Sequence, residues 1–293
     1  MIRISYSSSN TLLSCEHKFW LDKVVKAPRD PDAVESDAFA FGKVYHQVLE
    51  NTKHKAELYN ESILLDAARD CQCHIDELPK VFACLSRYYP MHFKSKLDCI
   101  ACEIEIGDGE SFIGYVDAIL VDRFGNWWIC DLKTSGMLMA SLFARLAQDS
   151  QLNIYACYVG QICKITGLDP AKFAGCRYRV VTKPKAVFKV NESFDSYAKR
   201  VNCESYDFAV PASLLNPDIY VRQLGKLREK AETLTEETTV KNRSNCLAYN
   251  RPCEYWSRCH GGLTYTECSE RAEMFTFTQD TMIDCTIVDE IAL

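Results

Sequence analysis

Alternation of apolar and polar residues predicts a group of strands in the middle of this chain. The segments 113–121 and 127–133 alternate with the two-residue period of a strand, and Asp122-Arg-Phe-Gly-Asn126 between them has turn composition. These two segments therefore predict one β-hairpin. Further strands are expected at 98–106, 176–182 and 186–190.

Helical periodicity predicts helices before, between and after these strands. The expected helices span 7–25, 39–55, 141–166, 193–208 and 217–237, and a helical insert, broken near Pro79, spans 61–96. Three strands, a crossover helix and further strands form a mixed sheet. We therefore expect an α/β fold with a mixed central β-sheet flanked by helices.

The predicted hairpin carries two carboxylates and a lysine. If its turn is centred near Phe124, Asp117 lies directly across from Asp131. Opposed residues in an antiparallel pair have β-carbons roughly 4.5 to 5.5 Å apart, which is close enough for two carboxylates to share one cation. Lys133 follows Asp131 by two residues and shares its face.

Two interpretations of these charges are open. On a solvated strand face, Lys133 would simply neutralise one carboxylate. The flanking residues, Tyr-Val-Asp-Ala-Ile-Leu-Val and Trp-Trp-Ile-Cys-Asp-Leu, are mostly apolar and place the charges in or beside a core. Buried unpaired carboxylates are costly, and a divalent metal offsets their repulsion, so the metal-site interpretation is favoured.

Asp117 followed by Asp131-Leu-Lys133 resembles the PD-(D/E)xK nucleases. The resemblance covers about residues 5–262. It implies a restriction-endonuclease-like core, in which the predicted hairpin holds the catalytic metal.

Flanking motifs are similar to the RecB-type branch, which includes the CRISPR-adaptation nucleases and the AddB exonuclease domain. Gly42-Lys-Val-Tyr-His46 matches its Gly-x-x-x-His pattern, and Gln151-Leu-Asn-Ile-Tyr155 matches its Gln-x-x-x-Tyr helix. Ser5-Tyr-Ser7 and Cys15 match the start of the branch. The family places Gln151 and Tyr155 beside the DNA backbone, whereas without the resemblance they are the polar edge of an amphipathic helix.

The resemblance also implies a set of metal ligands, namely His46, Asp117, Asp131 and the carbonyl of Leu132. Carboxylate and carbonyl oxygens suit magnesium or manganese, and a histidine tilts the preference toward manganese. Lys133 would position the attacking water and stabilise charge on the phosphate. Two simpler alternatives stay open: His46 as an ordinary helix histidine, and Glu103, a candidate for a second ion, as a solvated strand residue.

Charge gives no overall attraction to nucleic acid. The 293 residues are 47% hydrophobic, enough for a sizeable core, and carry a net charge of −6. Any DNA contact therefore needs a local basic surface. The candidate is a predicted strand face with basic residues mostly at odd positions, which can equally be a solvated face: Arg177, Arg179, Lys183, Lys185 and Lys189.

Cysteine usage indicates metal ligands. The first residues lack a targeting pattern, and no apolar stretch approaches the roughly 20 residues that span a bilayer, so we expect a cytoplasmic protein without a membrane partner. Because the cytosol keeps thiols reduced, the 16 cysteines do not suggest a disulfide framework.

Cys246, Cys253 and Cys259 lie in a short, loop-rich segment that could wrap around a metal centre. Iron-sulfur members of the RecB-type branch take a fourth ligand from the N-terminal helix, which implies Cys15 and a 4Fe-4S cluster. Zinc takes the same ligands, and spacing does not separate the two, although the resemblance favours iron-sulfur. Cys268 is the main rival for the fourth position.

Four other cysteines carry less weight as ligands. Cys71 and Cys73 point to different faces of a predicted helix. Cys99 and Cys102 are expected on opposite faces of their strand, with Cys102 in phase with the core.

The expected organisation is one nuclease domain over 1–262. Its N-terminal helix and residues 246–259 would form the cluster clasp, with the helical insert at 61–96 and the catalytic core at 98–190. No role is assigned to a C-terminal tail at 263–293.

From the resemblance we expect a Mg- or Mn-dependent DNA exonuclease. It would degrade single-stranded DNA from 5′ ends in recombination, repair or CRISPR-adaptation-like processing, with a recombination or integration protein as a partner class. Two alternatives stay open: a DNA-binding assembly module of a recombination complex, which the intact His46, Asp117, Asp131 and Lys133 set disfavours, and a zinc-stabilised endonuclease.

Overall fold

A computed structural model describes residues 2–31, 33, 37–110, 112–136, 141–142, 146, 149–247 and 252–273. The chain divides into two compact units. The first comprises Met1–Leu13 and Glu35–Thr235, and the second comprises Ser14–Val34 and Glu236–Leu293. Each unit is described by itself below. That residues 1–262 work as one nuclease domain stays a prediction.

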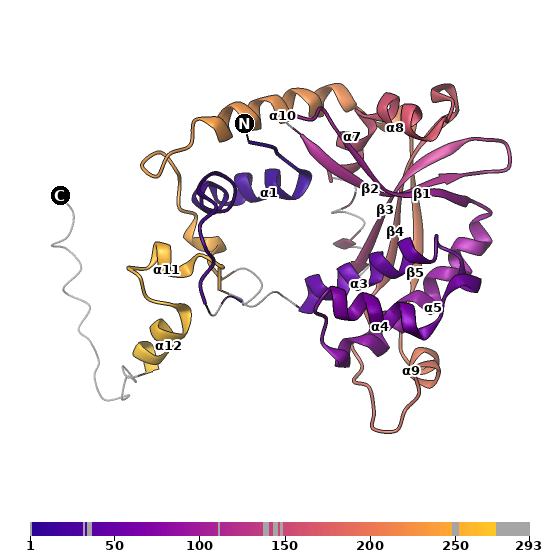
Figure 1. The fold of residues 1–293 in the computed structure, drawn as a ribbon, viewed down its shortest axis with the longest axis horizontal. Helices are drawn as coiled ribbons and strands as arrows, with labels where there is room; N and C mark the ends of the chain where they lie inside the picture. The colour runs from indigo at the N-terminus through magenta and orange to yellow at the C-terminus, as the bar shows by residue number, and fades with distance from the viewer. Residues whose placement is uncertain are drawn as a thin grey trace. The chain divides into compact units, whose positions relative to one another are not determined.

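The first unit is built on a five-stranded sheet in the order β1-β2-β3-β4-β5 (Figure 1). The strands are β1 (Asp98–Gly107), β2 (Ile113–Val121), β3 (Trp127–Ser135), β4 (Phe173–Thr182) and β5 (Ser205–Pro211). Strands β3 and β4 are parallel, and the other neighbours are antiparallel. The expected fold class is therefore confirmed as a mixed sheet flanked by helices.

The hairpin β2–β3 has the predicted turn. Asp122 Oδ1 accepts hydrogen bonds from the N–H groups of Phe124 and Asn126 at 2.8 and 2.9 Å, and Gly125 takes the left-handed φ of 80° that the turn needs. The strands pair from Val121–Trp127 to Ala118–Cys130. Asp117 and Asp131 are the next residues on each strand, where the ladder ends.

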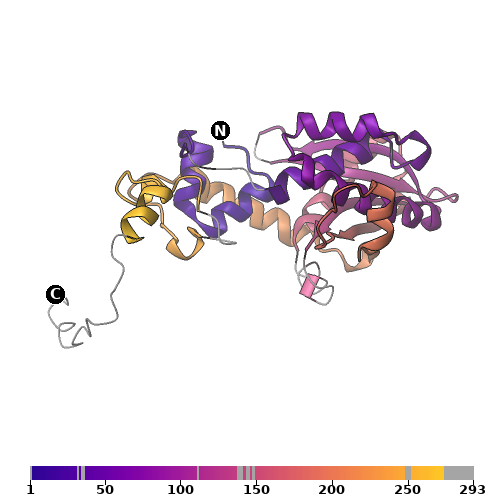
Figure 2. The same ribbon diagram turned by 90° about the horizontal axis from the view of Figure 1, so that it is seen from below.

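Helices cover both faces of the sheet in the first unit. Buried residues of α3, α4 and α5 pack against Ala118, Leu120 and Leu132, and those of α7 and α8 pack against Ile119 and Ile129. In Figure 2 the long helix α5, drawn in purple, runs alongside the strands. The helices are α1 (Tyr6–Ser14), α3 (Asp37–Asn51), α4 (Glu61–Asp70), α5 (Leu78–Ser95), α7 (Gln151–Ala156), α8 (Val159–Thr166), α9 (Phe194–Arg200) and α10 (Pro217–Glu232).

The second unit joins the N-terminal segment to the C-terminal one. It contains α2 (Glu16–Phe19), a π-helix (Trp20–Val25), α11 (Trp256–Cys259) and α12 (Tyr265–Glu273). Lys18 pairs with Glu254 at 2.9 Å, and Asp30 accepts hydrogen bonds from the N–H and hydroxyl of Ser257 at 2.7 and 2.5 Å. Side chains more than 200 positions apart in the sequence therefore hold this unit together. In the part of the chain that the structure describes, no helix has the length and apolarity to cross a membrane.

Breaks divide three of the predicted helical segments, and the break near Pro79 was expected. The helix predicted at 7–25 breaks at Cys15, whose backbone is extended with φ −159° and ψ 105°. The insert breaks before Pro79, because the proline starts α5 in the first turn, where its missing N–H costs nothing. The crossover contains two helices, α7 and α8, separated by a turn at 157–158, and part of its predicted range (143–145 and 147–148) lies outside the described residues.

Two predictions between 186 and 211 are wrong. No strand forms at 186–190, where Phe188 instead packs against Phe194 and Tyr197 of α9. The helix predicted at 193–208 ends at Arg200, and its last residues, from Ser205, belong to the edge strand β5, which pairs with β4 up to Pro211. The residues of β5 are half-exposed or exposed. The strand therefore forms because it pairs with β4, and no alternation of apolar residues indicates it in the sequence.

The expected basic strand face is also wrong at Arg179. This side chain has no exposed surface and donates hydrogen bonds to Tyr88, to Ser95 and to His92 Nδ1. It also pairs with Asp207 of β5, as does Arg177. Because β4 is an interior strand with α5 over this face, Arg179 is part of the core.

We predict that His92 makes the stability of the protein depend on pH. Burial and the neighbouring Arg179 charge lower the pKa of His92 to about 4, whereas an unfolded histidine titrates near ~6.5. Below ~6.5 the unfolded chain binds a proton that the folded chain excludes. The free energy of unfolding should therefore fall as the pH drops from ~6.5 toward 4.

Urea unfolding at several pH values tests this. In His92→Asn the dependence in this window should flatten by up to about 1.4 kcal/mol per pH unit, the value for one proton. The matched control is His74→Asn, because His74 is exposed, and it should keep the dependence of the unsubstituted protein. An unchanged slope in His92→Asn would contradict the prediction.

Candidate functional site

The candidate site lies where β2 and β3 separate. Beyond the Ala118–Cys130 pair the backbone ladder stops, and the Leu132 N–H donates to Asp117 Oδ2 at 2.6 Å instead of to a carbonyl. The Asp117 side chain thus sits between the two strands. Asp131 lies beside it on β3 and is almost completely buried, with 1% of its side chain exposed.

Three side chains with ligand atoms within 4.8 Å of one another meet here, from α3, β1 and β2: His46, Glu103 and Asp117. The His46 Nδ1 lies 3.4 Å from Asp117 Oδ1. Glu103 reaches the group because β1 pairs with β2 so that Cys102 faces Ala118 and Ile104 faces Val116, which places Glu103 opposite Asp117. One nitrogen and carboxylate oxygens fit a divalent cation such as manganese or magnesium.

Lys133 is held on the other side of the carboxylates. Its Nζ lies 2.7 Å from Asp131 Oδ2 and donates to Gln151 Oε1 at 2.8 Å. Gln151 Nε2 in turn donates to the hydroxyl of Tyr155 at 2.8 Å. Asp149 fixes the start of this helix by accepting from the Gln151 N–H at 2.9 Å. The lysine is therefore oriented by a chain of hydrogen bonds from α7.

Gly114 makes room for that chain. A Cβ at this position would lie 3.1 Å from the Phe112 ring and 3.2 Å from Tyr155 Cε1, tighter than ordinary packing. The missing side chain lets the Tyr155 ring lie against β2. The glycine thus contributes to the site through the placement of Tyr155.

The charges of the site are strongly coupled. Burial and the charge of Asp117 raise the pKa of Asp131 to about 7, although Lys133 opposes the shift. Burial and Asp117 likewise raise the pKa of Glu103 to about 7. Burial would also raise the pKa of Asp117, but the charge and hydrogen bond of His46 keep it below the ordinary value. Three carboxylates thus compete for two cationic side chains, and a divalent cation would relieve that competition.

An open cleft of ≈ 630 Å³ gives access to the site. His46, Glu103, Asp117 and Lys133 line it, together with residues of α3 such as Lys43. The cleft has the size of a small-ligand pocket.

A second predicted group lies in the other unit. The charges of Cys15 and Cys246 add to burial in raising the pKa of Cys259, and Cys15 does the same for Cys246. Burial raises the pKa of Cys253 to about 11, with a contribution from Cys246. The charge of Cys15 thus acts on Cys246 and Cys259, and Cys246 acts on Cys253, whose N–H donates to the Cys246 carbonyl at 2.7 Å. Four thiols suit an iron-sulfur cluster or zinc.

The structure thus gathers most of the predicted site residues in one place. His46, Asp117, Asp131, Lys133, Gln151 and Tyr155 surround the end of the hairpin. Glu103, predicted only for a second ion, joins His46 and Asp117, whereas Asp131 is engaged by Lys133. All metal-ligand roles, including those of Asp131 and the Leu132 carbonyl, stay predictions. The sequence analysis did not predict a role for Asp149, although an aspartate just before a helix is a known helix-start signal.

A sequence model of the PD-(D/E)XK nuclease superfamily matches residues 3–260. The chain belongs to this superfamily. A search of curated proteins gave no significant match. Membership in a nuclease superfamily indicates a hydrolase, and the group around Asp117 and Asp131 is its candidate site.

We predict that Gln151 acts on turnover through Lys133. Gln151→Ala removes one hydrogen bond from the lysine, so kcat for phosphodiester cleavage should fall about tenfold. Lys133→Ala should lower kcat much further. Metal affinity, measured by calorimetry, should change little in either variant because neither side chain belongs to the His46, Glu103 and Asp117 group.

Gln223→Ala is the matched control, since Gln223 is exposed on α10, and it should keep full activity. A loss of metal affinity in Gln151→Ala as large as its loss of turnover would refute this division of roles.

Proposed function

We propose that this protein is a Mg- or Mn-dependent DNA exonuclease of the RecB type. The observation that carries the proposal is the group formed by His46, Glu103 and Asp117 in an open cleft, next to a lysine held by Asp131 and Gln151. The motifs around His46, Gln151 and Tyr155 support the RecB-type branch.

In the proposed mechanism each side chain has a separate task. His46, Glu103 and Asp117 would hold the cation, with Asp131 and the Leu132 carbonyl as further ligands. When bound, the cation polarises the scissile phosphate and lowers the pKa of a bound water. Lys133 stays protonated, because Asp131 and Asp117 raise its pKa despite burial, and it stabilises the charge that develops on the phosphate. Gln151 and Tyr155 keep the lysine in place.

The substrate we propose is single-stranded DNA with a free 5′ end. This choice follows the iron-sulfur members of the branch, as do the proposed settings of recombination, repair or CRISPR-adaptation-like processing and a recombination or integration protein as partner. Lys43 and Lys133 in the cleft can contact phosphates.

We predict that linear single-stranded DNA is degraded from its 5′ end in the presence of Mn or Mg. Asp117→Ala and Asp131→Ala should each lower the rate more than about a hundredfold, because losing even an indirect metal contact costs tenfold or more. Glu103→Gln should weaken metal binding. Its matched control is Glu105→Gln, two residues along β1, where the side chain instead accepts from Tyr115.

Substrates labelled at either end, together with circular single-stranded DNA, provide the measurement. Circular DNA should resist cleavage. Cutting of the circle would identify an endonuclease instead, and retained cleavage in both aspartate variants would refute the site.

We propose further that Cys15, Cys246, Cys253 and Cys259 bind a 4Fe-4S cluster. The thiols are electrostatic neighbours within a unit that contacts such as Lys18–Glu254 and Asp30–Ser257 hold together. Cys15 lies where the backbone leaves helical geometry, which exposes its side chain to the C-terminal segment: its Sγ is 3.9 Å from the Val240 oxygen. A cluster would close a loop of more than 200 residues and so stabilise the fold.

We predict that replacing any one of these four cysteines with serine bleaches the brown protein and lowers its melting temperature. Activity should fall only indirectly, through lost stability. Matched controls are Cys71→Ser, Cys73→Ser and Cys268→Ser, which should keep the colour. The measurements are iron content, visible absorption and thermal unfolding.

Two results would overturn the cluster assignment. A colourless protein that loses zinc when any of these four cysteines is replaced would show that zinc, and not a cluster, occupies the same ligands. If Cys15→Ser keeps its full metal content and Cys268→Ser loses it, Cys268 and not Cys15 is the fourth ligand.

A further inference from the structure

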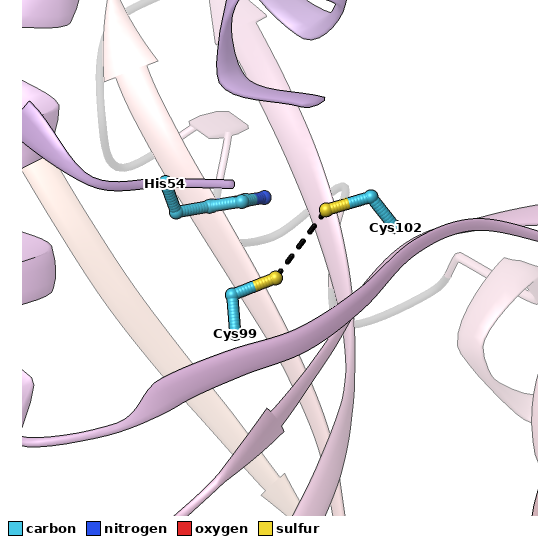
Figure 3. A group of neighbouring side chains, drawn as sticks. All are labelled: His54, Cys99 and Cys102. Atoms are coloured by element: carbon cyan, nitrogen blue, oxygen red, sulfur yellow. Dashed lines mark hydrogen bonds between the residues drawn. The ribbon is translucent and has the colours of Figure 1, made fainter. Parts of the chain in front are cut away.

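A second group of metal-binding side chains lies in the first unit, separate from the cleft and from the C-terminal cysteines. The ligand atoms of His54, Cys99 and Cys102 all lie within 4.8 Å of one another. Figure 3 shows the ring of His54 pointing toward the two sulfur atoms, which are 3.4 Å apart. His54 is buried and both cysteines are half-buried.

The imidazole of His54 is prepared for a ligand. Its Nδ1 contacts the hydroxyl of Tyr88, whereas its Nε2 is buried and has no hydrogen-bond partner among the residues that the structure describes. Buried polar atoms are rarely left unsatisfied in folded proteins. A tautomer that donates its Nδ1–H to Tyr88 leaves the Nε2 lone pair available, which is how metal-binding histidines are commonly oriented.

Irregular backbone brings the three residues together. Regular alternation would put Cys99 and Cys102 on opposite faces, as the sequence predicted, but a β-bulge between Cys99 and Ala101 shifts the register and turns both sulfurs to the same side. His54 follows α3 with a φ of 63°, and Lys53 before it has a φ of 45°. Left-handed backbone is uncommon in residues other than glycine and often marks a functional site.

We propose that His54, Cys99 and Cys102 bind a thiophilic divalent metal ion, with zinc as the fitting ion. On binding, the two thiols release two protons, and two Zn–S bonds and one Zn–N bond form, with a water in the fourth tetrahedral position. Cys102 precedes Glu103, and β1 carries both, so this ion would fix the strand that supplies a carboxylate to the cleft. The proposal does not depend on the nuclease activity.

Metal analysis of the full-length protein tests the proposal. After incubation with excess Zn²⁺ and removal of free metal, Cys99→Ser, Cys102→Ser and His54→Asn should each hold one equivalent less zinc than the unsubstituted protein. With Co²⁺ as a spectroscopic probe, the same variants should lose sulfur-to-cobalt charge-transfer absorption. Zn²⁺ should raise the melting temperature of the unsubstituted protein more than that of Cys102→Ser.

Two controls separate this site from the others. Cys163→Ser replaces a cysteine of α8 and should keep the full zinc content. Asp117→Asn removes a carboxylate from the cleft. In this background, Cys102→Ser should still lower the zinc content by one equivalent. The C-terminal cysteines are present in every variant, so their metal cancels in each comparison.

Equal zinc content in the unsubstituted protein, Cys99→Ser and Cys102→Ser would overturn the proposal. So would a protein that takes up no additional zinc but forms a Cys99–Cys102 disulfide under mild oxidation, detected as a loss of two hydrogens in its mass. That result would identify a redox pair instead. Circular dichroism shows which variants are folded. If His54→Asn does not fold, the conservative variant Cys102→Ser decides whether the site binds zinc.

Discussion

Repulsion among Glu103, Asp117 and Asp131 is the constraint on which the candidate site depends. The end of the β2–β3 ladder leaves Asp117 between the strands, and burial denies water to its neighbours. The cluster is tolerable only because His46 approaches from α3 and Lys133 is held from α7. A helix on one face of the sheet therefore supplies His46, and a helix on the other face holds Lys133 of β3 in position through Gln151.

The parallel pairing of β3 with β4 has a direct part in this arrangement. Parallel neighbours need a crossover, and here the crossover contains α7, which carries Gln151 and Tyr155. Lys133 on β3 and the groups that orient it on α7 thus follow one another along the chain. His46 is the exception, because it comes from a helix ahead of the sheet.

Local patterns predicted the parts of the fold that local forces determine. The β2–β3 hairpin followed from alternation and from Asp122 and Gly125 in its turn, so the neighbouring positions of Asp117 and Asp131 could be predicted from the sequence. Pairing with a distant partner was not predictable in this way: β5 exists because β4 offers an edge, and Arg179 is buried because α5 and Asp207 satisfy it. The meeting of Glu103 with His46, and of Cys99 with Cys102, depends on the register of β1 and its bulge, which no periodic pattern shows.

The two edges of the sheet carry irregularities that bear on behaviour at high concentration. An open strand edge can recruit the backbone of another molecule and start aggregation. On β1, the bulge after Cys99 and the left-handed Glu103, with a φ of 48°, interrupt the row of backbone groups, and acidic side chains add charge. On β5, Pro211 lacks a backbone donor at the strand end. The distortion that brings Cys99 and Cys102 together therefore also makes β1 a poor template for strands from other copies.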